Sequence, residues 1–356
     1  LILLLVPTLT IARQQNRQTP SVRLKSASAN AIEFTDIRIA APDSLQNLRS
    51  VREIRRAQSP RALQSRLRDL MKELGESGYA FAKIQLDSIA MTTTGSDTSY
   101  SLVVRVVPGK PVYVRGVRIA GNSVTREQTI RRELPVKIGS LFRESLIEEI
   151  SLSLRRMGIF RRVPRPQLLL DANGNGVLSI TVEEGQSNTF NGVIGYNPPV
   201  AAQPGFVSGL VDVKFGNLFG TGRQLAARWQ KRARDTQDLA LRYREPWLLG
   251  LPLHLEGGFQ QQLRDTLYVD RTFDLSAELP ILPRMALIGR VESSQITPDS
   301  LAIGLIPKSR ALSAGLGLRY DSSDDPINPT SGAFYWTILE SIDKSITIQN
   351  GAAEAA

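Results

Sequence analysis

The stretch that decides the fold is Leu312–Asp321, which reads LSAGLGLRYD. Apolar or aromatic side chains occupy every second position from Leu312 to Tyr320, and serine, glycine and arginine fill the positions between them. Because successive side chains of a β-strand point to opposite faces of its sheet, this alternation predicts a strand with one apolar and one polar face.

The same alternation recurs from about residue 190 onward, in segments of about ten residues, and we count about nine candidate strands. Clear examples are residues 225–230, 239–244, 253–260 and 273–279. Amphipathic segments of this length are typical of a transmembrane β-barrel. A half-buried sheet of a soluble protein gives the same alternation.

Two details favour the membrane. Charged residues recur along the polar face, as a water-filled lumen tolerates, and aromatic residues stand near segment ends, where an interfacial girdle belongs. The aromatic residues are Trp229, Tyr243, Trp247, Tyr320 and Trp336. The short turns Glu245–Pro252 and Leu279–Pro283 alternate with a longer, polar segment, Ile296–Arg310. We therefore expect an antiparallel transmembrane β-barrel.

The chain before this region has helical periodicity. Ser59 and Pro60 form a helix start, with Ser59 as N-cap and proline at the first helical position. The apolar stripe of this helix is Leu63, Leu67, Leu70, Met71 and Leu74, and Gly75 and Gly78 end it. Strands are expected at Phe34–Ile39, Tyr79–Ile89 and Tyr100–Val107, with a turn at Thr92–Ser99.

The pattern then repeats. A strand at Val112–Ile119 ends at Gly121 and Asn122, and Thr125–Gln128 fits a capping box in which Thr125 is the N-cap. A second helix carries Ile147, Ile150, Leu154 and Met157 up to Gly158, and strands Gln167–Leu170 and Val177–Val182 flank the hairpin turn Asn173–Gly176. The sequence thus predicts two α+β modules of about 75 residues each.

Composition excludes several classes of protein. The 356 residues carry a formal net charge of +10 and contain no cysteine, which excludes thiolate metal sites, a cysteine nucleophile and disulfides. The arginines are scattered rather than clustered beside a motif that reads nucleic acid. We therefore prefer basic side chains that line a water-filled lumen or face lipid phosphates over a nucleic-acid-binding surface. The apolar run Leu1–Ala12 is interpreted as part of a signal peptide and residues 13–31 as a linker, with a buried strand or helix as the alternative for the first segment.

No catalytic constellation is recognised. His254 is the only histidine and alternates with leucines, so a lumen-facing side chain is preferred to a metal ligand or a base. Asp171–Gly176 resembles the start of a calcium-binding loop, but Val182 stands where a glutamate ligand is required. Phe219–Arg223 precedes a strand rather than a helix, and Glu183-Glu184 is interpreted as a domain boundary. We expect that the protein is not an enzyme and that it binds neither a cofactor nor a metal.

Several segments of the sequence resemble parts of a known protein family. Residues 117–122, 130–134, 154–160 and 182–185 resemble a POTRA (polypeptide-transport-associated) domain, and Gly78-Tyr79-Ala80 with Val106–Gly109 resembles a divergent one. Residues 216–222 and 320–332 resemble barrel motifs of the BamA/TamA surface-antigen superfamily. The positions that carry the resemblance are Gly121, Asn122, Gly158, Phe160, Glu183, Gly216, Asn217, Phe219, Gly220, Gly222, Asp321, Asp324, Pro329 and Gly332.

The resemblance implies two POTRA modules, at 32–110 and 111–185, followed at 186–356 by the N-terminal part of an outer-membrane barrel. The family's late Val-Arg-Gly-Phe/Tyr motif has no match after Gly332, and the tail Gln349–Ala356 lacks a terminal aromatic residue. The barrel is therefore expected to be incomplete at its C-terminus.

The implied function is assembly or insertion of outer-membrane proteins without nucleotide hydrolysis. Two-partner-type secretion of a passenger protein is the alternative, and an exporter of its own hydrolase domain and a soluble β-sandwich binding protein are weaker hypotheses. The resemblance implies unfolded client proteins and outer-membrane lipid as partners, with periplasmic chaperones or accessory lipoproteins besides. It places the barrel in the bacterial outer membrane and the POTRA modules in the periplasm.

Overall fold

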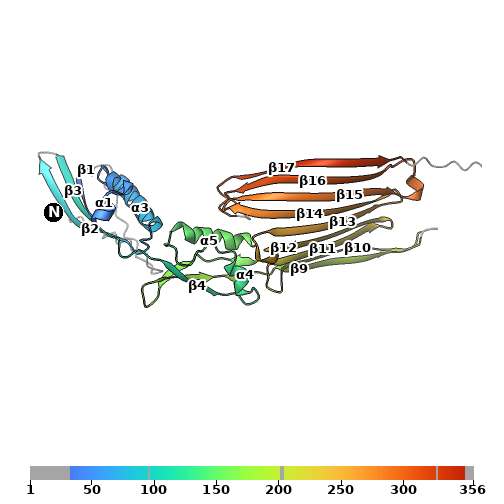
Figure 1. Cartoon of the computed structure of the whole chain (residues 1–356), viewed down its shortest axis with the longest axis horizontal. Helices are drawn as coiled ribbons and strands as arrows, with labels where there is room; N and C mark the ends of the chain where they lie inside the picture. The colour runs from blue at the N-terminus through green and yellow to red at the C-terminus, as the bar shows by residue number, and fades with distance from the viewer. Residues whose placement is uncertain (1–32, 95–96, 201–203, 326–327, 349–356) are drawn as a thin grey trace, which may run out of the picture. The chain divides into compact units, whose positions relative to one another are not determined.

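The computed structural model describes residues 33–94, 97–200, 204–325 and 328–348 (Figure 1). The expected signal peptide and linker lie outside the described residues. Contacts divide the chain into two compact units. The first comprises Leu1–Arg118, Pro135–Ile150 and Arg165–Ile180, and the second comprises Ile119–Leu134, Ser151–Pro164 and Thr181–Ala356. The module expected at 111–185 is therefore divided between the two units.

The first module is a three-stranded sheet with helices beside it. Its strands are β1 (Glu33–Ala40), β2 (Lys83–Thr94) and β3 (Asp97–Val107), in the order β1-β3-β2, with β1 parallel and β2 antiparallel to β3. Its helices are α1 (Asp43–Gln46), α2 (Arg49–Ile54) and α3 (Pro60–Glu76).

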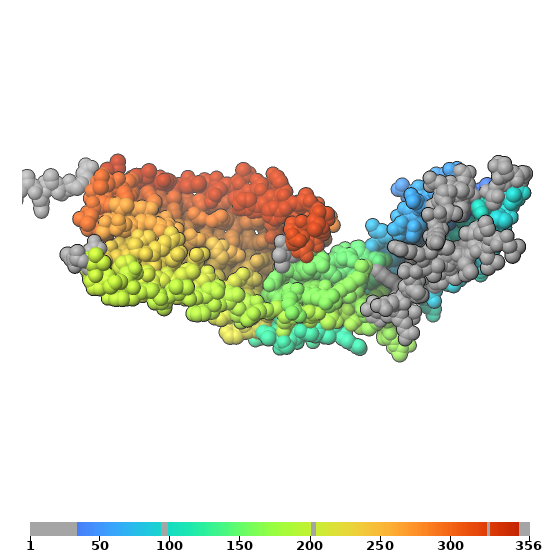
Figure 2. Space-filling model, turned by 180° about the vertical axis from the view of Figure 1, so that it is seen from behind, coloured from blue at the N-terminus to red at the C-terminus, as the bar shows by residue number. Residues whose placement is uncertain are grey.

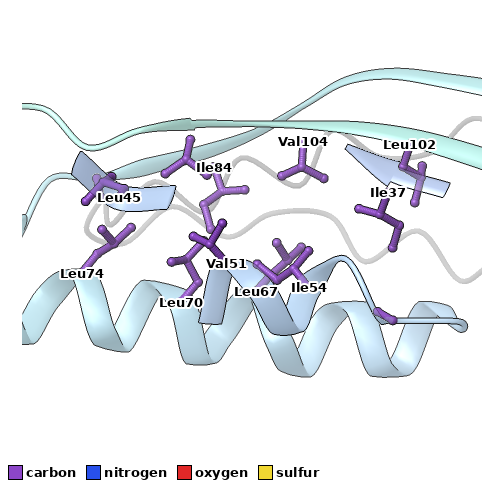
Figure 3. Close-up of a cluster of buried hydrophobic side chains, with 13 residues drawn as sticks. Ile37, Leu45, Val51, Ile54, Leu67, Leu70, Leu74, Ile84, Leu102 and Val104 are labelled. Atoms are coloured by element: carbon purple, nitrogen blue, oxygen red, sulfur yellow. The ribbon is translucent and has the colours of Figure 1, made fainter. Parts of the chain in front are cut away.

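Helix α3 begins and ends where the sequence predicts. The hydroxyl of Ser59 accepts a hydrogen bond of 3.3 Å from the backbone N–H of Ala62, and Gly78 follows the helix with φ +90°. Leu67, Leu70 and Leu74 are buried. Together with residues of the sheet and of α2 they form the core of this module, and Figure 3 labels Ile37, Ile54, Ile84 and Val104 among them.

The expected turn at Thr92–Ser99 is wrong in extent, because β2 continues to Thr94 and β3 begins at Asp97. Threonine is common in strands, although clusters of serine and threonine are also typical of loops. Strand β2 also begins later than expected, at Lys83, since Tyr79 and Ala82 form a turn with a 3.1 Å backbone hydrogen bond.

The second module contains β4 (Val114–Ala120), β6 (Gln167–Leu170) and β7 (Gly176–Thr181) in the order β4-β7-β6, with α4 (Glu127–Arg131) and α5 (Ser145–Arg156). A separate two-stranded pair joins β5 (Phe160–Arg162) to β8 (Glu183–Glu184). The predicted hairpin turn is confirmed, since the Asp171 N–H donates to the Asn175 carbonyl at 2.9 Å.

The predicted capping box at Thr125–Gln128 is wrong. Helix α4 has Arg126 as its N-cap residue, and no side chain caps it. The hydroxyl of Thr125 instead accepts a hydrogen bond from Asn217, a residue 92 positions away. A tertiary contact has therefore replaced the local one that the pattern indicates.

The remaining strands form one antiparallel sheet of nine (Figures 1 and 2). They follow one another in chain order, from yellow-green to red in Figure 2. They are β9 (Asn188–Asn197), β10 (Phe206–Leu218), β11 (Arg223–Ala233), β12 (Thr236–Glu245), β13 (His254–Arg264), β14 (Tyr268–Leu282), β15 (Met285–Pro298), β16 (Lys308–Asp321) and β17 (Phe334–Thr347). Short 3₁₀ turns, η1 (Leu248–Gly250) and η2 (Ser300–Ala302), lie between strands.

The apolar face of this sheet is its exposed face. On β16, Leu316 is 77% exposed whereas Ser313 is 8% exposed. Ion pairs join strands on the opposite face, among them Arg242 with Glu256 and Arg319 with Glu278. This polarity is the reverse of a half-buried soluble sheet and fits a barrel wall with lipid outside and polar side chains inside. Among the described residues, no helix is long and apolar enough to cross a bilayer.

Two details of the sheet differ from expectation. Trp336 lies directly opposite Arg319, on the face that carries the ion pairs, so it does not belong to a girdle on the apolar face. The long connection is shorter than Ile296–Arg310, because β15 continues to Pro298 and β16 begins at Lys308. In the described part of the chain, β9 and β17 are the two ends of the sheet, as expected of an incomplete barrel.

Candidate functional site

Several of the positions singled out in the sequence gather where the second module contacts turns of the nine-stranded sheet. We call this contact the junction. All of its residues belong to the second compact unit. On the module side it comprises Ser123–Glu133, Arg155, Arg156 and Glu184; on the sheet side it comprises Asn217–Gly222, Trp247 and Asp321–Asp325.

Asn217, at the end of β10, links the turn to the module. Its side-chain N–H donates to the hydroxyl of Thr125 at 2.9 Å, and its side-chain oxygen accepts from the N–H of Gly222 at 2.8 Å. The residue is only 9% exposed. A buried amide with satisfied donor and acceptor fixes the shape of the turn and its place on the module.

The backbone of Gly220 lies very close to the backbone of the module. Its carbonyl accepts from the N–H of Arg126 and from the hydroxyl of Thr129, each at 2.9 Å. A Cβ atom at Gly220 would overlap the carbonyl oxygen of Val124, and the residue has φ +71°. Both observations require glycine here.

A third set of contacts surrounds Glu133. The indole N–H of Trp247 donates to its carboxylate at 2.7 Å, and the guanidinium of Arg132 lies 6.0 Å from the centre of the indole ring. Arg132 also donates to the carbonyl of Thr221 at 2.6 Å. Burial raises the pKa of Glu133, and the hydrogen bond from Trp247 and the charge of Arg132 oppose that change.

Glu184 holds the segment that contacts the turn. Its carboxylate accepts hydrogen bonds from the N–H groups of Ser123, Val124 and Thr125, at 2.9, 2.8 and 2.6 Å. Burial acts to raise the pKa of Glu184, but these hydrogen bonds and those from the Ser123 and Thr125 side chains outweigh it and lower the pKa to about 2. Glu184 is thus a charged clamp on the loop before α4.

The two neighbouring motif residues shape the same loop. Gly121 has φ +87°, and a Cβ atom there would overlap the carbonyl oxygen of Val182. The Asn122 side chain donates to the carbonyl of Thr125 at 3.0 Å. Both residues therefore support the backbone around Thr125.

Helix α5 contacts the turn between β16 and β17. The guanidinium of Arg156 lies 3.3 Å from the carboxylate of Asp321 and donates to its carbonyl at 3.1 Å. Arg155 donates to the carbonyl of Asp324 and lies 3.8 Å from Asp325. Desolvation lowers the pKa of Arg156, with the charge of Asp321 opposing it.

Asp324 organises that turn. Its carboxylate accepts from the hydroxyl and the N–H of Thr330, at 2.5 and 2.9 Å, and from the N–H of Ser331 at 3.1 Å. These hydrogen bonds hold the pKa of Asp324 well below its ordinary value. Pro329 and Gly332 are exposed in the same turn, and Gly332 has φ +110°.

The other motif positions play smaller parts. The N–H of Gly216 donates to Ser187 at 2.9 Å, and the carbonyl of Phe219 accepts from the Arg126 guanidinium at 3.0 Å while its ring is exposed. Phe160 pairs with Glu184 in the short β5–β8 pair. Glu183 forms ion pairs with Arg161 and Arg162 rather than with the junction, and a Cβ at Gly158 would meet open space.

Sequence reasoning did not identify the module's half of the junction. The sequence pattern assigns Thr125 to a helix cap and Glu184 to a domain boundary, and it gives Thr129, Arg132 and Arg156 no role of their own. On the sheet side it assigns Trp247 to a girdle. The local signal is the Glu183-Glu184 pair, and Glu184 is the residue of this pair that belongs to the junction. The contacts of the others join residues 89 to 165 positions apart, which no local pattern encodes.

The junction offers hydrogen bonds and ion pairs between parts of the chain. His254 begins β13 directly opposite Glu278, on the face that carries the ion pairs, as a lumen-facing side chain would. Within residues 33–94, 97–200, 204–325 and 328–348, no three His, Asp or Glu side chains come together as a metal site. The arrangement is suited to holding a module on a sheet.

Comparisons with known proteins agree with this architecture. Residues 112–185 match the POTRA family, described as a surface antigen variable number repeat. The chain is 25% identical over 182 residues to "Outer membrane protein assembly factor BamA" of Neisseria meningitidis serogroup B, covering 51% of this chain and 22% of that protein. It is 28% identical over 162 residues to the protein of the same name from Neorickettsia risticii, covering 46% and 21%. The chain therefore spans about a fifth of the length of these relatives.

A solved structure shows the same fold. The crystal structure of BamA from Haemophilus ducreyi lacking POTRA domains 1-3 superposes with a TM-score of 0.58 at 18% identity, over 88% of this chain and 63% of that one. By their names the two relatives are outer-membrane proteins, and the solved structure shows that this chain has the fold of such a protein. Residues 112–185 thus contain a POTRA domain, and the chain is similar over about half of its length to two BamA proteins.

Proposed function

We propose that this protein assembles other proteins into the outer membrane, and that it does so without catalysing a covalent reaction. The observation that carries the proposal is the junction, in which a POTRA domain is hydrogen-bonded to the turns of an apolar-faced sheet. A client held by the module would thereby be delivered to the mouth of the barrel. The relatives named as assembly factors support the same function.

The client would be recognised through its backbone. Each described three-stranded sheet ends in strands that have one neighbour, such as β2 with twelve residues and β6 with four. An extended client segment can add to such an edge by backbone hydrogen bonds, which read strand geometry rather than sequence. Unfolded outer-membrane proteins are rich in such segments.

The same mechanism explains why hydrolysis of a nucleotide is not needed. Strands that leave water for a barrel satisfy their backbone groups by pairing, and their apolar faces enter lipid, so insertion is favourable once pairing begins. The protein would act by lowering the barrier to the first pairings. Periplasmic chaperones and accessory lipoproteins would deliver clients to the POTRA domain.

Depletion of the protein tests the proposal. We expect lower amounts of several unrelated outer-membrane barrels, restored by the wild-type gene. Unchanged barrels together with loss of a single secreted protein would instead support two-partner-type secretion. Unchanged barrels and unchanged secretion would contradict both functions.

A further inference from the structure

The turns of the sheet at the junction end carry exposed apolar side chains that the proposed function does not use. Because neighbouring strands are antiparallel, the turns after β10, β12, β14 and β16 all lie at the same end of the sheet. The first three present large apolar residues, which are Phe219 after β10, Leu249 and Leu251 after β12, and Ile281 and Leu282 at the end of β14. We call these five residues the apolar turns.

The exposure is large. Leu249 is 92% exposed, Phe219 is 76% exposed and Leu282 is 58% exposed. Leucine and phenylalanine side chains that stay in water at the tips of turns contribute no free energy of burial. Several such residues at one end of a protein mark an interaction surface.

The backbone of these turns holds the side chains outward at a conformational cost. Phe219 and Leu249 have φ of 55° and 53°, in the left-handed region that disfavours bulky residues. Glycine or asparagine would suit either position better. Backbone strain at an exposed turn points to a role for the side chain held there.

Lipid is the occupant that fits this surface. The apolar turns continue the exposed apolar face of the sheet, since Ile281 follows Leu275 and Leu279 at alternate positions of β14 and Leu251 precedes Leu255 at the start of β13. That face contacts the bilayer, so its extension into the turns places their tips at the boundary between acyl chains and headgroups.

The module contributes to the same surface. Val124 is exposed, and its carbonyl lies beside Gly220, next to Phe219. Arg126, which donates to the Phe219 carbonyl, and Arg131, which forms an ion pair with Glu127, are exposed nearby in the chain. Arginines beside an apolar tip suit a layer of lipid phosphates.

We propose that the apolar turns and Val124 enter the periplasmic leaflet of the outer membrane, so that phospholipid holds the POTRA end of the sheet at the membrane surface. The inference rests on the membrane location of the sheet and not on client assembly. A vesicle experiment without a client can therefore fail while the proposed function stands, and the reverse.

The absence of cysteine makes a direct test simple. The protein is reconstituted in vesicles of phosphatidylethanolamine and phosphatidylglycerol, after Leu249→Cys or Leu282→Cys is labelled with the environment-sensitive dye bimane. Spin-labelled phosphatidylcholine with its quencher near the headgroup measures contact with lipid. Leu316→Cys, on the apolar face, and Asn173→Cys, in the exposed hairpin turn of the module, are the matched lipid and water controls.

We expect blue-shifted emission at both turn positions and quenching at least about twofold above that at Asn173, as for residues at an interfacial depth. Emission and quenching equal to those at Asn173 would overturn the proposal. Blue-shifted emission without quenching by the lipid would also overturn it, because protein rather than phospholipid would then cover the turns. Quenching at Leu316 in each preparation verifies insertion.

Discussion

The side-chain amide of Asn217 donates a 2.9 Å hydrogen bond to the hydroxyl of Thr125, across 92 positions of sequence. The same amide closes its own turn through the N–H of Gly222. One side chain therefore determines both the conformation of a barrel turn and the position of the POTRA loop against it. The hydrogen bonds that Gly220 accepts depend on the same placement.

Replacement Asn217→Ala should loosen this contact. It removes the donor from which the Thr125 hydroxyl accepts and leaves the N–H of Gly222 without its acceptor, at a cost of about 1–3 kcal/mol. Amide hydrogen exchange of Arg126, whose N–H donates to Gly220, should become faster. Asn191→Ala, on exposed strand β9, is the matched control and should change the stability by less than about 0.5 kcal/mol. Equal exchange in the two variants would contradict a linking role for Asn217.

The ion pair between Arg156 and Asp321 should couple helix α5 to the β16–β17 turn. Both side chains are partly buried, so the pair is less screened than a surface pair. In a double-mutant cycle with Arg156→Ala and Asp321→Ala, the coupling energy should lie at about 0.5–3 kcal/mol, measured by urea unfolding from vesicles.

The pair of Arg161 with Glu183 is the control for that cycle. Arg161 is largely exposed, so its coupling should stay below about 1 kcal/mol. A coupling for Arg156 and Asp321 no larger than that of the control would show that the turn is held by its backbone contacts alone.

The sequence predicts the strands better than the junction, for a physical reason. Alternation of side chains is a property of neighbouring residues, so Leu312–Asp321 carries the strand and its two faces within ten positions. The start of α3 is equally local, because Ser59 caps an N–H three residues away. The nine strands and their order follow from such segments and the turns between them.

The junction depends on distant partners instead. Thr125 satisfies the local pattern of a capping box, yet its hydroxyl is used by Asn217. Glu183 and Glu184 are indistinguishable in composition, but their side chains leave the short strand in different directions and meet arginines and backbone N–H groups respectively. Resemblance to the family identified Asn217, Gly220 and Asp321, and only the fold reveals what each one contacts.

Acid should weaken the Glu184 clamp. Its pKa falls from an ordinary 4.5 to about 2 on folding, so the unfolded chain binds a proton before the folded one does. The stabilisation is complete above pH 4.5 and is lost as the pH falls toward about 2. Glu184→Gln should lower the free energy of unfolding at neutral pH by about 1–2 kcal/mol, as for loss of a capping side chain.

The pH dependence separates this role from simple packing. Between about pH 5 and about pH 3 the wild type should lose stability faster than Glu184→Gln, because the variant has no carboxylate to protonate at this position. Glu183→Gln, with its exposed arginine partners, is the matched control and should keep the wild-type slope. Parallel pH profiles for wild type and Glu184→Gln would refute the clamp.

Gly121 offers the sharpest test of the loop beside the clamp, because Gly174 has nearly the same backbone conformation in a different environment. Their φ values are +87° and +79°, so alanine costs about 1–2 kcal/mol of left-handed strain at either position. At Gly174 nothing lies within 4 Å of the added Cβ, whereas at Gly121 the carbonyl of Val182 occupies its place. That carbonyl belongs to the segment that leads to Glu184, so Gly121→Ala must displace the clamp as well as strain the turn.

Thermal unfolding should therefore show a larger loss of stability for Gly121→Ala than for Gly174→Ala, and hydrogen exchange at Ser123–Thr125 should rise in the first variant alone. If the two variants lose equal stability, the contact with the Val182 carbonyl contributes nothing, and conformational strain accounts for the loss in both variants.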